Sequence, residues 1–488
     1  MNLKQEANSW QLPGNPTSRY GVALFGVLAI AWLLWSVLRT FEPSGSQLLR
    51  ALATAISVPI LLVWFHNREK LAGRVRKLLW VLVLAIIAIF AAGSALIVFL
   101  NVIHPPEWDF LTFWLDGHVA IRGLNFYEPA NYQAVPLPIT PSGAFTPEIL
   151  DVGFRYPPPT MLLFMPLGLL DIRTAIVVWY AAHGVVLAWC VVLLWKTFLG
   201  KNGLTGLVFA IALVAVVAGT FSTFQYAQTN FLALLMLLLF WRDREKLRGG
   251  AWLTIGAFVK PFLLLLLMIP MIRKKWRVLL GALITLVAIS VLTISVVGIE
   301  TFLAYFSDNP AGRAADFVYT ETTNQSLLAT ILRLGEYDIN DRSMLTHPVY
   351  VGTAIILTAI TGWLLHSLKG DSADWGLGLV LILALIVYPA SQFFYSVFLL
   401  VPLLLLWVRR EEIPTGAAGT GALITVIFVL ITIGGYVFVA NILLWSILAA
   451  LSGWILLSRG SRSSELQRNL QWPEVGRRMV KQTSGSIQ

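Results

Sequence analysis

Cysteine is almost missing from this chain, since Cys190 is the only one among 488 residues. It lies within an apolar run, so neither an intrachain disulfide nor a cysteine-based metal site is expected. Charge is scarce as well: 12% of the residues are charged, whereas soluble domains carry about a quarter. With 57% hydrophobic residues, this composition excludes a soluble globular protein and predicts an all-α polytopic membrane protein.

The signatures of soluble catalysts are also missing. The chain has no P-loop, no G-x-G-x-x-G, no H-E-x-x-H and no nucleophile elbow. An enzyme of this kind lacks a cytosolic nucleotide-binding domain, so we expect its donor substrate to be carried in the membrane. The formal net charge of +10 does not indicate nucleic-acid binding, because the basic residues form short clusters between apolar runs. Such clusters are typical of the cytoplasmic ends of spans, which contact anionic membrane lipids.

About twelve apolar runs are long enough to cross a bilayer, some of them only as shorter helices inside a bundle. They lie near residues 21–39, 47–66, 77–103, 174–199, 204–222, 228–241, 276–298, 348–368, 375–390, 394–408, 418–437 and 441–457. The first run is longer than the core of a signal peptide and lacks a cleavage pattern, so we interpret it as a retained span. We expect one membrane domain, 19–458, between polar ends at 1–18 and 459–488.

Basic clusters set the expected orientation in the plasma membrane, because they favour the cytoplasmic side. The loop after the second span, the turns near 196–201, 242–248 and 409–410, and the C-terminal tail all carry such clusters. Both termini are then cytoplasmic. The windows expected on the extracytoplasmic face are 104–157, 221–230, 299–347 and 388–393.

Two short segments do not fit a simple series of spans. Residues 249–272 lie between two basic clusters and contain Lys260-Pro261, and proline breaks the helical ladder. We predict a re-entrant hairpin of two half-helices there, and a half-helix entering from the outside at 158–170. In the alternative topology both segments are full membrane spans, and the basic cluster at 241–248 lies outside. Lys260 either snorkels to the cytoplasm or has a function, and the hairpin is not expected to bring it to the outer leaflet.

The window 104–159 concentrates polar and aromatic residues between apolar runs. Its chemistry-bearing residues are Glu107, Asp109, Asp116, His118, Tyr127, Arg155 and Tyr156. Residues 109–122 have a helical period, which predicts a helix lying along the interface with its aromatic face in lipid. A carboxylate on this helix either faces a cavity and has a function or is simply solvated. We expect the first for Asp109 and the second for Asp116. We expect His118 to be structural.

Further polar residues fall in the other outer windows. Gln228 and Asn230 begin one apolar span, while Asn324-Gln325-Ser326 opens an outer-loop helix that carries Arg333. Each alone is compatible with capping or loop structure. Together on one face they are candidates for binding a sugar and a phosphate.

Five segments in order resemble glycosyltransferase family 87, the polyprenyl-phosphate-mannose-dependent mannosyltransferases of the GT-C superfamily. The segments are DFLTFWLDGHVAIRGLNFYEP at 109–129, FRYPPPTMLLFMPLGLL at 154–170, AQTNFLALL at 227–235, GAFVKPFLLL at 256–265 and NQSL at 324–327 with Arg333. The third segment has Ala227 where the family pattern has glycine. Each motif is weakly specific alone, and their order over roughly 100–410 carries the resemblance.

The resemblance implies a GT-C-like bundle and an inverting, metal-independent transfer of a hexose, mannose above all. The implied donor is a polyprenyl-phosphate sugar at the outer leaflet, the acceptor is a lipid or glycan, and no cofactor is needed. It makes Asp109 the essential carboxylate. Chemically, one base that deprotonates the acceptor suffices, because the leaving group is already a phosphate. Phosphate stabilisation is expected from Arg155, Arg333, Asn324 or Gln325. Further substrate contacts are expected from Glu107, Tyr127, Tyr156, Gln228, Asn230 and Tyr395.

One position departs from the family. Many relatives carry a histidine in the late outer turn, and this chain has Phe394 there, followed by Tyr395. If that histidine assists proton transfer in relatives, this chain does without it or uses Tyr395 or His118, so the choice of sugar stays open. Two other functions remain possible interpretations of the sequence. A transporter or flippase for a lipid-linked glycan also uses broken helices and intramembrane charge, and would show inverted repeats. A structural subunit of an envelope-assembly complex would not need the acidic residues.

Overall fold

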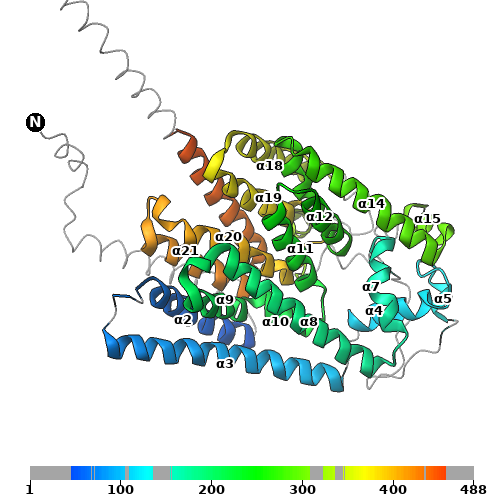
Figure 1. The fold of residues 1–488 in the computed structure, drawn as a ribbon, viewed down its shortest axis with the longest axis horizontal. Coiled ribbons are helices and arrows are strands. Elements are labelled where there is room, and N and C mark those ends of the chain that lie inside the picture. The colour runs from blue at the N-terminus through cyan, green and yellow to red at the C-terminus, as the bar shows by residue number, and fades with distance from the viewer. Residues whose placement is uncertain are drawn as a thin grey trace, which may run out of the picture.

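The computed structural model describes residues 45–67, 69–70, 72–104, 109–133, 135, 154, 156–307, 322–335, 345, 347–433 and 436–457. The regular elements in this part of the chain are all helices (Figure 1). Its one isolated β-bridge joins Asn324 to Gln392. The predicted all-α polytopic membrane fold is therefore confirmed.

Six helical segments in the described chain are long and apolar enough to cross a membrane. They are Gln47–Asn67 within α2 (Gly45–Asn67), α3 (Gly73–Ile103), Ile172–Val216, α14 (Trp276–Val297), α18 (Pro348–Ser367) and Val437–Leu457. The third consists of α8 (Ile172–Leu194) and α9 (Gly203–Val216), which are separated by a turn. Four shorter apolar helical segments accompany them, at Pro261–Ile272, Ala373–Val387, Phe393–Val408 and Gly416–Thr432. The predicted run at 21–39 lies outside the described residues.

The remaining elements are short. They are α4 (Phe110–Ala120), α5 (Ala130–Gln133), η2 (Pro158–Thr160), α7 (Met161–Gly168), η3 (Trp195–Leu199), η4 (Gly200–Asn202), α10 (Ala218–Gln225), α11 (Asn230–Asp243), α12 (Leu247–Val259), η5 (Pro261–Leu267), α13 (Met268–Ile272), α15 (Ile299–Ser307), α17 (Leu327–Gly335), η7 (Gly370–Ser372), α19 (Ala373–Val387), η8 (Phe393–Leu399), α20 (Leu400–Val408), η9 (Arg410–Glu412) and α21 (Gly416–Thr432).

The predicted basic turns meet at one end of the bundle. Arg244 and Arg409 both bind the carboxylate of Asp374, and Lys275 pairs with Glu245. We call this end, formed by 242–248, 273–275, 369–374 and 409–412, the basic end. Three of the positive clusters that the sequence predicts on one side of the membrane, at 242–248, 273–275 and 409–410, thus lie together in the fold.

The opposite end is formed by 224–230, 322–326 and 388–395, and we call it the site end. The Asn324 side chain donates a hydrogen bond to the Pro389 carbonyl over 2.8 Å, so the second and third of these segments are in contact. In Figure 1 the elements α4, α7 and α15 gather beyond the bundle on this side. The alternation of helices between the two ends agrees with the predicted topology, while the leaflet that each end faces stays a prediction.

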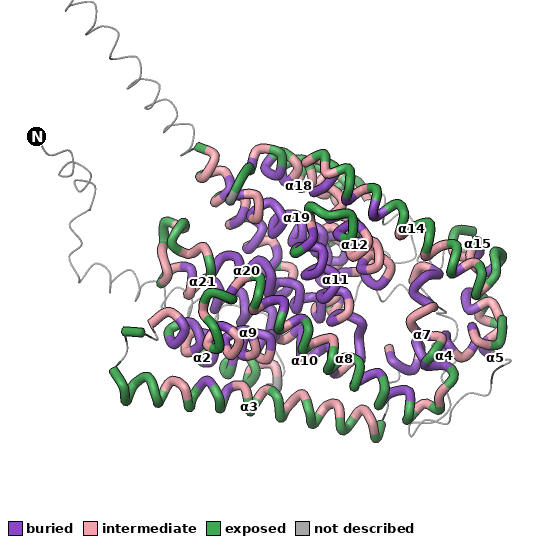
Figure 2. The backbone as a smooth tube through the Cα atoms, in the orientation of Figure 1, coloured by how far each residue is buried: buried purple, intermediate pink, exposed green. Residues whose placement is uncertain are grey.

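Burial divides the helices into a core and an outer layer. All residues from Trp375 to Ile386 of α19 are buried, whereas α3 and α14 expose many leucine, isoleucine and valine side chains (Figure 2). A helix that is apolar on all faces is typical of a membrane span. The exposed apolar sides of α3 and α14 are therefore the surfaces expected to contact lipid.

The predicted re-entrant hairpin is present. Helix α12 has 13 residues and spans roughly 20 Å, less than the roughly 30 Å of a hydrocarbon core. The chain then turns at Lys260-Pro261 and returns through η5 and α13 to the basic end, where Lys275 pairs with Glu245. Glycines let α12 approach α14 closely, because a Cβ on Gly250 would collide with the backbone at Val278.

The predicted helix at 109–122 is confirmed as α4, but the prediction that its aromatic side lies in lipid is wrong. Phe110, Phe113 and Trp114 are all buried. The ring of Phe113 stacks on Phe164 of α7 at a centroid distance of 4.3 Å. Helical periodicity finds the apolar face, yet it cannot tell whether lipid or a second helix covers it. Here α7, the short helix within the predicted segment 158–170, covers it.

Candidate functional site

The tip of the hairpin carries a buried cation. Lys260 is 1% exposed and ends α12 in an extended conformation, which the following Pro261 favours. Its ammonium nitrogen donates hydrogen bonds to Gln228 Oε1 over 2.9 Å and to the Tyr395 hydroxyl over 3.4 Å. Both acceptors belong to the site end. The expectation that the hairpin falls short of the outer residues is therefore wrong: Lys260 lies among them.

Aromatic rings surround this ammonium group. Its nitrogen lies 4.7 Å from the ring centroid of Tyr395 and 5.7 Å from those of Tyr156 and Phe394. Ring faces attract cations, and the attraction increases where water is excluded. Phe394, the residue that stands in place of a histidine, thus belongs to the enclosure of Lys260, and Tyr395 adds a hydroxyl to it.

Asp109 supplies the negative charge that acts on this cation. Its carboxylate interacts electrostatically with Lys260 and with Tyr395. Asp109 precedes the first residue of α4, and its side chain makes no capping hydrogen bond to that helix. The helix dipole favours an ionised carboxylate at this position. The start of α4, the hairpin tip and η8, which are far apart in the chain, therefore come together around Lys260.

The turn before α11 positions Gln228. His183 in α8 bonds to the Gln228 carbonyl through Nε2 over 2.7 Å, while the Asn230 amide donates to the Thr223 hydroxyl over 3.0 Å. Asn230, a candidate binding residue, is thus occupied in holding the turn. Sequence reasoning did not single out His183, although an ionisable side chain inside a predicted span is a usable signal.

The same turn contains Ala227, which stands where the family pattern has glycine. Ala227 has a φ of +49°, in the left-handed region that costs most residues with a Cβ about 1–2 kcal/mol. Glycine adopts this conformation without that cost. Since the pattern has glycine here, the backbone shape is retained and the alanine bears the strain.

Tyrosines and a second carboxylate form a layer beneath the site. The Tyr127 hydroxyl donates to the Tyr156 carbonyl over 2.8 Å. The Tyr132 hydroxyl is 2.7 Å from the Phe126 carbonyl and also bonds Asp116. Burial raises the pKa of Tyr127 and of Tyr132, and the Asp116 charge adds to both shifts. Asp116 is 1% exposed, so the expectation of a solvated acid is wrong.

The outer-loop candidates bind the protein's own backbone. Arg333 Nη1 donates to the Asn324 carbonyl over 2.9 Å, and Asn324 Nδ2 donates to the Pro389 carbonyl over 2.8 Å. Gln325 receives a hydrogen bond from the Phe438 amide over 3.1 Å. Burial lowers the pKa of Arg333. This cluster of Asn324, Gln325 and Arg333 joins α17 to the segment before η8, and its described contacts are structural.

Two other candidates and one structural residue complete the set. Glu107 and Arg155 lie outside the described residues. His118, expected to be structural, stacks on Trp114 and bonds to the Gly168 carbonyl through Nδ1 over 2.8 Å. It therefore ties α4 to α7, away from the hairpin tip. Of the predicted site residues, the structure gathers Asp109, Tyr156, Gln228 and Tyr395 around Lys260.

Comparison with protein families matches residues 154–389 to the model of glycosyltransferase family 87. Searches of curated proteins and of solved structures returned no match. The matched range contains Lys260, Gln228 and the Asn324 cluster, whereas the segment with Asp109 precedes it. The place of Asp109 in the site therefore rests on its interaction with Lys260. The match confirms the resemblance seen in the sequence: over residues 154–389 the chain is similar to glycosyltransferase family 87, which supports a membrane glycosyltransferase.

Proposed function

We propose that this protein transfers a hexose, mannose above all, from a polyprenyl-phosphate sugar to a lipid or glycan acceptor on the extracytoplasmic side of the plasma membrane. The observation that carries the proposal is the buried Lys260 ammonium group at the site end, which interacts electrostatically with the Asp109 carboxylate. The Asp109 carboxylate supplies a base, and the buried Lys260 ammonium group, surrounded by aromatic rings, supplies a phosphate-binding cation. The base acts on the acceptor hydroxyl, and the cation stabilises the phosphate that leaves.

Asp109 is the general base in this proposal. Its carboxylate takes the proton of the acceptor hydroxyl as that oxygen attacks the anomeric carbon. The bond from the anomeric carbon to the phosphate oxygen breaks, and the electron pair leaves with the polyprenyl phosphate. Attack from the side opposite the leaving phosphate inverts the anomeric centre. The products are the glycosylated acceptor, the lipid phosphate and a protonated Asp109.

Lys260 stabilises the departing phosphate. Its ammonium group is fixed by Gln228 and Tyr395 before substrate arrives, so little reorganisation is needed as negative charge develops. This role differs from the expectation that placed Arg333 and Asn324 at the phosphate, since those side chains bond to backbone carbonyls. The aromatic rings of Phe394 and Tyr156 help to exclude water from Lys260, which strengthens the attraction.

Reconstitution tests the proposal. The purified protein in liposomes receives polyprenyl-phosphate mannose or polyprenyl-phosphate glucose, with a membrane lipid extract as acceptor, and products are identified by mass spectrometry. We expect a glycosylated lipid from at least one polyprenyl-phosphate sugar and none from the matching nucleotide sugar. Transfer from the nucleotide sugar would refute the donor class. Passage of the intact donor across the bilayer without any new glycosidic bond would instead establish a flippase.

A further inference from the structure

A groove opens at the basic end, away from Lys260 and Asp109. Its volume is about 660 Å³. Its lining comes from α8, η3, α11 and the start of α19: Trp189, Val192, Leu193, Lys196, Thr197, Trp241, Arg242, Arg244 and Asp374. One part of this lining is apolar and the other is charged, and the proposed transfer reaction uses none of these residues.

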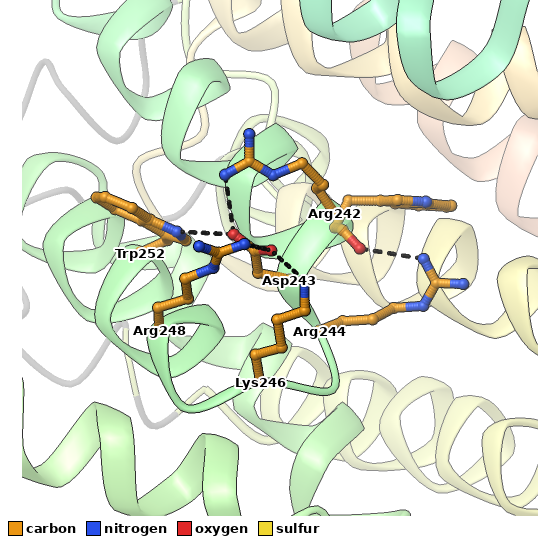
Figure 3. A network of polar contacts seen from close by, with 7 residues as sticks. Arg242, Asp243, Arg244, Lys246, Arg248 and Trp252 are labelled. Atoms are coloured by element: carbon orange, nitrogen blue, oxygen red, sulfur yellow. Dashed lines mark hydrogen bonds and ion pairs between the residues drawn. The ribbon is translucent and has the colours of Figure 1, made fainter.

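A buried carboxylate organises the charged part. Asp243 is 0% exposed and accepts hydrogen bonds from Arg242 over 2.9 Å and Arg248 over 2.8 Å, as Figure 3 shows. The Trp252 indole and the Lys246 ammonium group approach it at 3.3 and 3.4 Å. Three basic side chains thus share one carboxylate, and the cluster keeps an excess of positive charge.

A second carboxylate repeats this pattern beside the groove. Asp374 binds Arg244 over 2.8 Å and Arg409 over 3.2 Å. Arg244 also lies 5.5 Å from the ring centroid of Trp241, which keeps its guanidinium group at the groove wall. Lys196 is exposed, and within the described part of the chain no hydrogen bond or ion pair engages it. The groove therefore attracts anions, and Lys196 has free donors for one.

The apolar part of the groove is exposed on α8. Trp189 is 60% exposed, and Val192 follows it on α8, where both face outward. The helix then widens into the π-helical turn η3, which carries Lys196 and Thr197. Tryptophan is enriched where a span meets the headgroup region. An apolar stripe that ends in lysine and arginine matches a lipid chain that ends in a phosphate.

We propose that this groove binds one anionic phospholipid of the leaflet at the basic end, with its phosphate at Lys196 and Arg242 and an acyl chain along Trp189 and Val192. Basic recesses between membrane helices bind such headgroups in general. A soluble phosphate would use the basic residues alone, whereas the exposed apolar stripe directly beside them favours a lipid. Binding there would hold α8 against α11 and α19.

Native mass spectrometry of the purified full chain tests this site. The probe is phosphatidylglycerol, compared with phosphatidylcholine, and glycerol 3-phosphate serves as the headgroup without chains. The wild type should retain one phosphatidylglycerol and no phosphatidylcholine. Lys196→Ala should weaken retention about fivefold and Lys196→Glu about thirtyfold, taking about 1 kcal/mol for each charge step.

The matched control is Lys201→Glu, because Lys201 is exposed on the same turn and does not line the groove. Trp189→Ser should also weaken retention while leaving Lys196 in place. Equal loss in Lys196→Glu and Lys201→Glu would overturn the proposal in favour of a diffuse surface charge. Displacement of the lipid by an equal concentration of glycerol 3-phosphate would overturn the role of the apolar stripe.

Discussion

Lys260 and Gln228 approach each other from opposite directions: the hairpin enters from the basic end, and its ammonium nitrogen lies 2.9 Å from the Gln228 side-chain oxygen at the site end. This contact makes a re-entrant segment part of the candidate active site. It also holds the Lys260 ammonium group in place, because Gln228 is itself held by the hydrogen bond between His183 and the Gln228 carbonyl. Burying a cation in an apolar bundle costs free energy, so a buried lysine of this kind is a candidate for a functional role.

Lys260→Gln should lower kcat/KM for a polyprenyl-phosphate donor by about 10²–10³-fold, the size expected when one oxyanion-stabilising donor is lost. Steady-state kinetics in liposomes measure this. Lys274→Gln is the control, because it removes an exposed charge at the other end of the same hairpin. If Lys260→Gln lowered Tm while the folded enzyme kept its activity, Lys260 would be a structural residue only.

Arg333→Ala should destabilise the protein by about 1–3 kcal/mol, since it leaves the Asn324 carbonyl without its donor. We expect a lower Tm and an unchanged KM for the donor. Arg122→Ala is the comparison, because Arg122 is an exposed arginine that bonds within its own helix segment. A raised KM at unchanged Tm would show that Arg333 binds the donor after all.

Ala227→Gly should raise stability by about 1 kcal/mol, because glycine removes the strain of a positive φ. The gain is reduced by the extra freedom of glycine in the unfolded chain. Thermal unfolding in detergent measures it. Ala233→Gly in the interior of α11 should instead lower stability. If both substitutions lowered Tm equally, the strain at Ala227 would carry no energetic weight.

Orientation is open to cysteine labelling, since the native Cys190 is buried. Glu128 near the site end and Lys201 on the basic side are both exposed, so each accepts a cysteine. A membrane-impermeant maleimide should label Glu128→Cys on intact cells. It should label Lys201→Cys only after permeabilisation. The reverse pattern would place the site in the cytoplasm and exclude an outer-leaflet donor.

Local sequence signals predicted most of the fold. Basic clusters on both sides of Lys260-Pro261 indicated the hairpin, and helical periodicity indicated α4. What periodicity could not supply was the partner of each face. Phe113 packs against Phe164, which lies in a separate helix. Hence α4 was expected in lipid, and Asp116 in water, although both are buried.

The site was predicted in part for the same reason. Asp109, Tyr156, Gln228 and Tyr395 were singled out, and all of them gather at the hairpin tip. Lys260 was singled out too, but its position at the site end could not be predicted. That position depends on the length of α12 and on how α12 packs against its neighbours. The Asn324 cluster appeared free because its acceptor, the Pro389 carbonyl, is remote in sequence. Long-range contacts of this kind have no local signature.

Sugar transfer by Asp109→Asn, measured beside Asp116→Asn, tests the central claim most directly. Both substitutions remove a carboxylate associated with α4, yet only Asp109 interacts with Lys260 in the proposed mechanism. With polyprenyl-phosphate hexose in liposomes, Asp109→Asn should lose about 10²–10⁴-fold in kcat at wild-type Tm. Asp116→Asn should lower Tm and keep the activity of the folded enzyme. Turnover of Asp109→Asn at the wild-type rate would contradict the assignment of Asp109 as the base.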